Sequence, residues 1–289
     1  MNGIRSIFLI PNLTKKRAYE TSVEVIGKLL ELGIQVLMDC SLKRQYESQN
    51  EIFWGDTDNI LRLCDMVLTI GGDGTIIHAA RKAALLDKPI LGINTGRLGF
   101  VAELEPNELD MLSRLADGDY SIEKRMMLKV THRDKEFYAM NDAVISRGSL
   151  SRLIDIDISL AEDKGYICHY RADGLIVSTP TGSSAYSLAA GGPVVEPTMK
   201  CIVMTPVCSH SLFARPVVFS HHSQLALSAA CDDNTKVYLT LDGVKTMIIN
   251  RSDVIYVTSS QIETKLIKLK DKTFYKVLND KFTEKGRQV

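Results

Sequence analysis

The sequence predicts an α/β domain built on a parallel sheet, followed by a second domain whose antiparallel strands form a sandwich. Strand-like and helix-like periods alternate over the first 120 residues, whereas strand-like segments dominate from residue 121 onward. A chain of 289 residues is long enough for two ordinary domains. We therefore expect an α/β domain at 1–120, rejoined by 262–289, and a β-sandwich domain at 121–261.

Short apolar runs predict the strands of the first domain, because buried parallel strands are apolar on both faces. We expect these strands at 4–10, 34–38, 66–70 and 89–93. Helical spacing of apolar residues predicts a helix that Thr14 caps and Gly33 ends, and further helices at 75–86 and 106–116. This order is typical of β-α-β units.

The second domain is expected to consist of short strands in an antiparallel arrangement, with a sandwich as the natural architecture. These strands are predicted at 127–132, 137–145, 154–160, 167–171, 175–178, 201–206, 224–229, 236–241, 245–249 and 254–258.

The overall composition excludes several classes of protein. Lysine plus arginine and aspartate plus glutamate both total 35, so no excess of positive charge attracts nucleic acid. No stretch approaches the roughly 20 apolar residues that cross a bilayer, and we expect a cytoplasmic protein. The 6 cysteines are scattered without a C-x-x-C pair, which indicates reduced thiols rather than disulfides or a zinc site.

The most informative motif is the turn Gly71-Gly72-Asp73-Gly74-Thr75, between an expected strand and an expected helix. Gly71, Gly72 and Gly74 let backbone N–H groups approach phosphate oxygens, and the helix that begins near Thr75 adds its positive end. A carboxylate beside phosphates is tolerated as a base or as a partner of magnesium, and both duties belong to phosphoryl transfer. The alternative is a plain tight turn in which Asp73 caps the helix.

A second turn, containing Asn94 and Gly96, follows the next expected strand and should lie at the same edge of the sheet. Its amide and its glycine suit a phosphate site, although an ordinary left-handed turn is the alternative. The chain has neither a G-x-x-x-x-G-K-[ST] loop nor a G-x-G-x-x-G turn after its first strand. It is therefore neither a P-loop enzyme nor an ordinary dehydrogenase.

Asn141 and Asp142 interrupt the apolar run at 137–145. Burying two polar side chains costs free energy unless they are paired or face a ligand. An amide suits the edge of adenine and a carboxylate suits ribose hydroxyls. The alternative is a bulge or strand end with solvated side chains.

The segment 179–192 is rich in hydroxyl groups and glycine. Thr181 or Ser183 could cap a short helix there, and Tyr186 could stack on a base. A nucleophilic serine is disfavoured because the segment contains no G-x-S-x-G elbow. Asp242, which precedes glycine, fits a hairpin turn.

Together these motifs resemble the NAD kinase family. The match spans most of the chain in the right order: Gly71-Gly72-Asp73-Gly74-Thr75, Asn94-Thr95-Gly96-Arg97-Leu98-Gly99-Phe100, Asn141-Asp142, Asp173-Gly174, Thr179-Pro180-Thr181-Gly182-Ser183-Ser184-Ala185-Tyr186 and Arg215-Pro216. Phosphofructokinases and lipid kinases share the first motif. The Asn-Asp and Thr-Pro-Thr-Gly segments favour NAD kinases.

The resemblance implies an enzyme that binds NAD in the cleft between two domains and uses ATP, or polyphosphate in some members, with magnesium. It also implies a homo-oligomer, usually a tetramer, whose subunits help to complete the site. Asp73 would be the proton acceptor for the 2′-hydroxyl of the adenosine ribose, with Gly74 in contact with NAD.

The resemblance implies further NAD contacts in the second domain. Asn141 and Asp142 would hold adenosine, while Arg171 and Asp173 would lie in the nicotinamide or neighbouring-subunit part of the site. The other implied NAD contacts are Thr181, Ser184, Ala185, Tyr186, Ser187, Leu188 and Ala189, together with His78, Arg152 and Asp242.

The chain departs from the usual family pattern at three places. Ser184 replaces a usual threonine but keeps the hydroxyl, Val244 replaces a frequent glutamine, and Ser209 replaces a usual proline. The sequence is also consistent with two other functions: a lipid kinase of similar architecture, and an NAD-binding regulator without catalysis.

Overall fold

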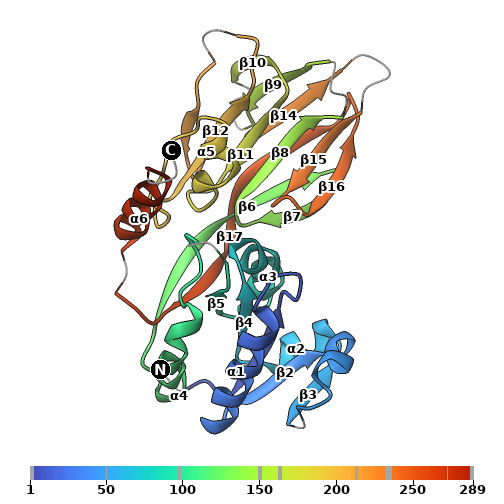
Figure 1. Ribbon diagram of the computed structural model, residues 1–289. Coiled ribbons are helices and arrows are strands. Elements are labelled where there is room, and N and C mark those ends of the chain that lie inside the picture. The colour runs from blue at the N-terminus through green and yellow to red at the C-terminus, as the bar shows by residue number, and fades with distance from the viewer. Residues whose placement is uncertain are drawn as a thin grey trace. The chain divides into compact units, whose positions relative to one another are not determined.

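The computed structural model describes residues 3–49, 51–96, 99–148, 152–161, 165–211, 214–231, 236–271 and 273–286. Arg97 and Leu98 of the second turn motif lie outside these ranges. The chain forms two compact units, which we describe separately (Figure 1). The first contains Met1–Lys124 and Thr264–Val289, and the second contains Arg125–Glu263.

The first unit is built on a parallel sheet with the order β17-β5-β4-β1-β2-β3. Every residue of the central strand β4 is buried, as a strand covered on both faces requires. The first five strands are β1 (Ser6–Pro11), β2 (Gln35–Asp39), β3 (Ile52–Gly55), β4 (Met66–Gly71) and β5 (Ile90–Asn94). The last part of β17 (Val254–Lys268) joins this sheet, where Leu266 pairs with Ile90 of β5.

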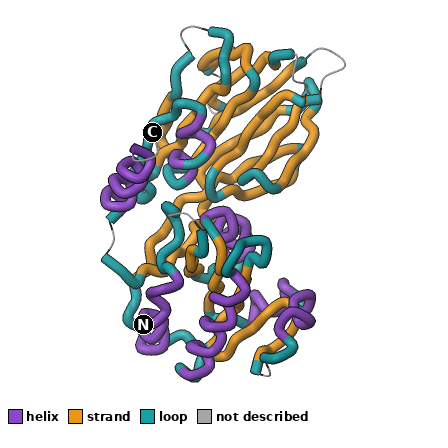
Figure 2. Tube along the Cα trace, in the orientation of Figure 1, coloured by secondary structure: helices purple, strands orange, loops and turns teal. Residues whose placement is uncertain are grey.

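Helices alternate with these strands along the chain (Figure 2). The helix α3 buries one face that is mostly alanine, which allows it to pack closely against β4 and β5. The helical segments of this unit are α1 (Ala18–Glu31), η1 (Cys40–Tyr46), α2 (Thr57–Leu63), α3 (Asp73–Leu85), η2 (Pro106–Leu112), α4 (Ser113–Asp117) and α6 (Phe274–Gly286).

Three details of this unit differ from the sequence prediction. The helix α1 begins at Ala18 and not after Thr14, because Arg17 adopts a left-handed conformation with φ of 73°. The strand β3 and the helix α2 were not predicted, since each is short and its apolar residues show no clear period. The sheet therefore has two strands beyond the four that the sequence indicates, β3 and the end of β17.

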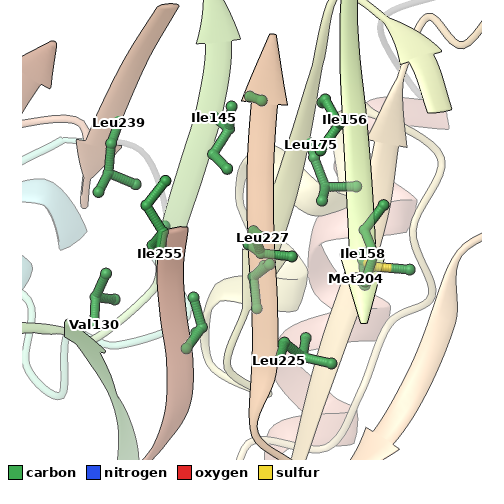
Figure 3. Packing of buried hydrophobic residues seen from close by; sticks show 14 of the residues in the cluster. Val130, Ile145, Ile156, Ile158, Leu175, Met204, Leu225, Leu227, Leu239 and Ile255 are labelled. Carbon is green, nitrogen blue, oxygen red and sulfur yellow. The ribbon is translucent and has the colours of Figure 1, made fainter. Parts of the chain in front are cut away.

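The second unit is a sandwich of two antiparallel sheets. One has the order β13-β12-β11-β8-β15-β16 and the other contains β10-β9-β14-β17. Apolar side chains of both sheets face one core, as Figure 3 shows for Ile145, Leu175 and Leu239 of one sheet and Ile158 and Leu227 of the other. The predicted fold class, an α/β domain and an all-β domain, is confirmed.

The strands of this unit are β6 (Ser121–His132), β7 (Lys135–Ala139), β8 (Asp142–Arg147), β9 (Ile154–Leu160), β10 (Tyr166–Ala172), β11 (Gly174–Ser178), β12 (Cys201–Val207), β13 (Val217–Ser220), β14 (Leu225–Ala230), β15 (Val237–Leu241), β16 (Lys245–Ile249) and the start of β17. The strand expected at 137–145 was wrong: it is two strands, β7 and β8, separated at Met140 and Asn141. The strand β13 was not predicted. In the part of the chain that the structure describes, no helix is long and apolar enough to cross a membrane.

Candidate active site

The glycine turn of the first unit joins β4 to α3. The strand ends at Gly71, Gly72 is the N-cap, and Asp73 is the first residue of the helix. A Cβ atom on Gly71 would lie 2.3 Å from Oγ1 of Thr75, so the close return of the chain requires glycine. Around Gly72 and Gly74, by contrast, a Cβ atom would meet nothing within 4 Å. The turn therefore presents open backbone at the positive end of a 13-residue helix, as a phosphate site needs.

Asp73 is held by the backbone of a loop nearly 30 residues away in sequence. Its carboxylate accepts hydrogen bonds from the N–H groups of Phe100 at 2.6 Å, Val101 at 3.2 Å and Ala102 at 3.1 Å. An ionised carboxylate can accept about four hydrogen bonds, so one acceptor direction remains for a ligand. The loop thus fixes the orientation of Asp73, which sequence analysis could not foresee.

The second turn lies beside the first, because β4 and β5 are parallel neighbours and Gly71 is paired with Asn94. The Thr95 N–H donates to the carbonyl oxygen of Gly71 at 2.8 Å. The side chain of Asn94 is buried and its Oδ1 accepts from the N–H of Gly96 at 3.2 Å, so this amide shapes its own turn. The Oγ1 atom of Thr95 is buried without a hydrogen-bond partner.

Asn12, at the end of β1, is a contact that the sequence did not reveal. Its Nδ2 donates to Oγ1 of Thr75 at 3.1 Å and so ties the first β-α turn to the glycine turn. His78 lies one turn further along α3 and is exposed.

In the second unit, Asn141 and Asp142 lie where β7 gives way to β8. Both side chains are buried, with exposures of 9% and 5%, and Oδ1 of Asn141 has no hydrogen-bond partner. Burial and, to a smaller extent, the negative charge of Asp242 together raise the pKa of the Asp142 carboxyl to about 7. A buried amide acceptor without a partner and a desolvated carboxyl are typical of a ligand site.

Asp242 occupies the turn between β15 and β16. Its carboxylate accepts the N–H groups of Met140, Asn141 and Asp142. The structure thus brings Asp242 against a segment that lies about 100 positions earlier in the sequence.

The segment after β11 contains η3 (Gly182–Ser184) and α5 (Tyr186–Ala189). Neither Thr181 nor Ser183 caps α5: Oγ of Ser183 accepts from the N–H of Val195, and Thr181 is buried next to Arg125. Ser187 is also buried, with Oγ 2.8 Å from Oγ1 of Thr205.

Other residues of this segment are available to a ligand. Ala185, Tyr186 and Ala189 are exposed, and Ser184 and Leu188 are partly exposed.

A cavity of about 260 Å³ opens beside Tyr186 and is lined by strands β8, β11 and β12. Asp173 lies in this cavity and pairs with Arg147, whose Nε is 2.9 Å from the Asp173 carboxylate. Arg147 was not predicted, because a lone arginine at a strand end carries no pattern. Arg152 and Arg171 are exposed, and neither lines this cavity.

Gly182→Ala is expected to destabilise the second unit and to disturb the Asn141 site. A Cβ atom at this position would lie 2.1 Å from the backbone oxygen of Asn141, and neither backbone can yield as a flexible side chain would. We expect a loss of about 1–3 kcal/mol in the free energy of unfolding, measured by urea titration. Gly27→Ala is the control, because nothing lies within 4 Å of a Cβ there. Equal stability of the two variants would contradict this prediction.

Known proteins are similar to this chain in sequence and in fold. The family model for the ATP-NAD kinase N-terminal domain matches residues 7–120, and the model for the C-terminal domain matches 140–269. The NAD kinase of Caldanaerobacter subterraneus is 39% identical over 98% of this chain and 100% of its own length. The NAD kinase of Moorella thermoacetica is 37% identical over 98% of this chain and 91% of its own length.

Solved structures agree with these matches. The yeast NADH kinase in complex with NADH superposes with a TM-score of 0.85 and 25% identity, covering 96% of this chain and 86% of its own. The NAD kinase of Archaeoglobus fulgidus in complex with ATP shares the fold, with a TM-score of 0.73, 22% identity and coverage of 96% of this chain and 98% of its own. From the family models and the relatives, this chain belongs to the NAD kinase family.

Proposed function

We propose that this chain transfers the γ-phosphate of ATP to the 2′-hydroxyl of the adenosine ribose of NAD, which produces NADP. One observation carries the proposal: a carboxylate, Asp73, is fixed by three backbone N–H groups at the start of a helix, next to an open glycine turn. A base and a phosphate site side by side are what phosphoryl transfer to an alcohol needs.

The chemical step assigns a role to each part of this turn. The oxygen of the 2′-hydroxyl forms a bond to the γ-phosphorus while the bond to the β,γ-bridging oxygen breaks and ADP leaves. Asp73 accepts the hydroxyl proton through its remaining acceptor direction. Backbone N–H groups of the turn, at Gly72 and Gly74, stabilise the charge on the transferred group. Gly71, Thr75, Asn94 and Gly96 shape the turn around it, and the N–H of Thr75 donates to the carbonyl oxygen of Gly72.

The second unit supplies the residues that we propose for NAD. The free Oδ1 of Asn141 accepts a hydrogen bond from the adenine amino group, and Asp142 accepts from ribose hydroxyls. The exposed ring of Tyr186 offers a stacking surface. The remaining proposed NAD contacts are Gly74 and His78 of the first unit, and Arg152, Arg171, Asp173, Thr181, Ser184, Ala185, Ser187, Leu188 and Ala189 of the second.

Magnesium is the divalent cation that we propose to enter with ATP. Over the described ranges, no three His, Cys, Asp or Glu side chains form a group that could hold a metal ion. Magnesium is commonly bound by substrate phosphates, waters and one or two carboxylates, so we propose that the phosphates of the donor carry the cation into the site. The cation would neutralise charge on the phosphates.

The proposed function is tested by incubating the protein with NAD, ATP and magnesium and detecting NADP with an NADP-specific dehydrogenase. NADP should accumulate only when all three are present. Phosphorylation of a lipid alcohol without NADP would favour a lipid kinase, and NAD binding without ATP binding would favour a non-catalytic regulator. Parallel reactions with polyphosphate and with NADH define the donor and acceptor range.

The cytoplasmic location and the homotetramer stay predictions. Cell fractionation tests the first, and size-exclusion chromatography with light scattering tests the second.

The raised pKa of Asp142 predicts a pH-dependent stability. Because the pKa is about 7 in the folded protein and about 4 in an unfolded chain, this carboxyl favours folding below pH 4. That contribution is lost as the pH rises through about 7. Asp142→Asn should therefore raise the melting temperature more at about pH 8 than at about pH 5.

The control is Asp134→Asn, because Asp134 is an exposed aspartate in a turn of the same unit. It should show the same small change at both pH values. An Asp142→Asn effect that is equal at both would contradict the burial argument.

A further inference from the structure

The turn that joins β15 to β16 is made by Asp242 and Gly243. Their φ angles are 50° and 68°, so both residues are in the left-handed region that Asp tolerates and Gly favours. In an isolated hairpin, an aspartate at this position would extend into water. Here its side chain instead reaches the start of β8.

The Asp242 carboxylate binds three consecutive backbone N–H groups. Oδ2 accepts from Met140 at 2.9 Å, and Oδ1 accepts from Asn141 at 2.7 Å and from Asp142 at 3.1 Å. A hairpin turn needs none of these bonds, because the donors belong to a different part of the chain. The bonds therefore serve the segment that contains Asn141 and Asp142.

The carbonyl groups of the same three residues are also satisfied. Thr179 donates its hydroxyl to the oxygen of Met140 at 2.6 Å and its N–H to the oxygen of Asn141 at 2.8 Å. The N–H of Asp242 donates to the oxygen of Asp142 at 3.0 Å. All six backbone polar groups at 140–142 thus have partners inside the protein.

In contrast to these backbone groups, Oδ1 of the buried Asn141 side chain has no hydrogen-bond partner. An unsatisfied buried acceptor costs about 1–3 kcal/mol of folding free energy. If the backbone at 140–142 could move, it would shift so that this oxygen gained a hydrogen bond. The bonds from Asp242 and Thr179 prevent that shift. The acceptor is therefore held ready for a donor that comes from outside the protein.

We propose that Asp242 is a positioning residue that clamps the backbone at 140–142, so that Asn141 and Asp142 are oriented for NAD before it binds. This inference rests on the proposed binding of NAD by Asn141 and Asp142. It assigns Asp242 a positioning role in place of the direct NAD contact that the resemblance implies, because its carboxylate accepts three hydrogen bonds from the backbone that carries Asn141 and Asp142.

The clamp also acts on Asp142 through charge. Asp242 is a negative neighbour of the buried Asp142 carboxyl and adds to the rise in its pKa. Among the charged groups of the described chain, Asp242 is the one whose charge acts on this pKa. Removing Asp242 should therefore lower the pKa of Asp142.

The test uses Asp242→Gly, which keeps a residue suited to the left-handed turn and removes the clamp, and Asp242→Asn, which keeps one acceptor oxygen. Asp134→Gly is the matched control, because Asp134 has φ of 61° in the hairpin turn between β6 and β7. Three quantities are measured: hydrogen exchange of residues 138–143 without ligand, the KM values for NAD and ATP, and the pH dependence of kcat/KM for NAD.

We expect faster exchange at 138–143 in Asp242→Gly and a rise in the KM for NAD of at least about tenfold. The KM for ATP should stay unchanged, and kcat should change by less than about threefold. The acidic limb of the pH profile should move to lower pH, which a general loss of folded enzyme would not cause. Asp242→Asn should show a smaller rise in KM, and Asp134→Gly should show none of these changes.

Unchanged exchange at 138–143 would overturn the clamp, and so would an unchanged KM for NAD. A higher KM with unchanged exchange would indicate a direct contact with NAD instead. If the wild-type protein makes no NADP, the proposed function fails, while the exchange measurement still decides whether Asp242 clamps the segment.

Discussion

Replacing Asp73 with asparagine is expected to lower kcat for NADP formation by about 10²–10⁴-fold, because the amide cannot accept the proton of the 2′-hydroxyl. NAD binding should remain largely intact, since the proposed adenosine contacts, Asn141 and Asp142, belong to the second unit. The coupled NADP assay measures the rate, and calorimetry measures NAD binding.

The structure requires a careful control for this variant. The oxygen of an asparagine side chain can accept from the N–H groups of Val101 and Ala102. Its NH₂ group then lies near the N–H of Phe100 and cannot accept that hydrogen bond. The matched control is Asp65→Asn, because Asp65 also accepts two backbone N–H groups, from Arg5 and Ser6, at 2.9 Å each. This control should keep its activity. An active and well-folded Asp73→Asn protein would exclude Asp73 as the base.

Gly99→Ala is expected to lower kcat by about 10²-fold without any change to the base itself. A Cβ atom on Gly99 would lie 2.0 Å from Oδ1 and 2.6 Å from Cγ of Asp73, so the carboxylate must leave its place against the loop. A misplacement of about 1 Å in a catalytic group can cost 10²-fold in rate. Steady-state kinetics at saturating NAD and ATP measures this loss.

A double-mutant cycle shows whether Gly99 acts through Asp73. In the Asp73→Asn background, Gly99→Ala should reduce the rate little further, because the group that it displaces no longer acts as a base. Fully additive effects would mean that Gly99 contributes through the backbone of the loop instead.

The sequence predicted the fold class because its signals are local. The buried strand β4 is a continuous apolar run, and the expected strands at 154–160 and 245–249 have the bounds of β9 (Ile154–Leu160) and β16 (Lys245–Ile249). Apolar spacing is enough here because each strand buries a face that its own residues define.

The errors arose where distant residues decide the local structure. The run at 137–145 looks like one strand, yet β7 ends at Ala139 and β8 begins at Asp142. The N–H groups at this break donate to Asp242, about 100 residues away. No window of sequence around the break contains that partner. The strands β3 and β13 were missed because four residues are too few to show a period.

The sequence by itself determined which residue types meet in each motif: glycines for close backbone approach, an aspartate beside them, and an Asn-Asp pair in an apolar run. Only the tertiary structure decided what the three aspartates do. Asp73 is oriented by a loop, Asp142 is desolvated, and Asp242 is occupied by backbone N–H groups. The physical reason is that hydrogen bonding and pKa depend on the atoms within a few ångströms, and folding brings those atoms from distant parts of the chain.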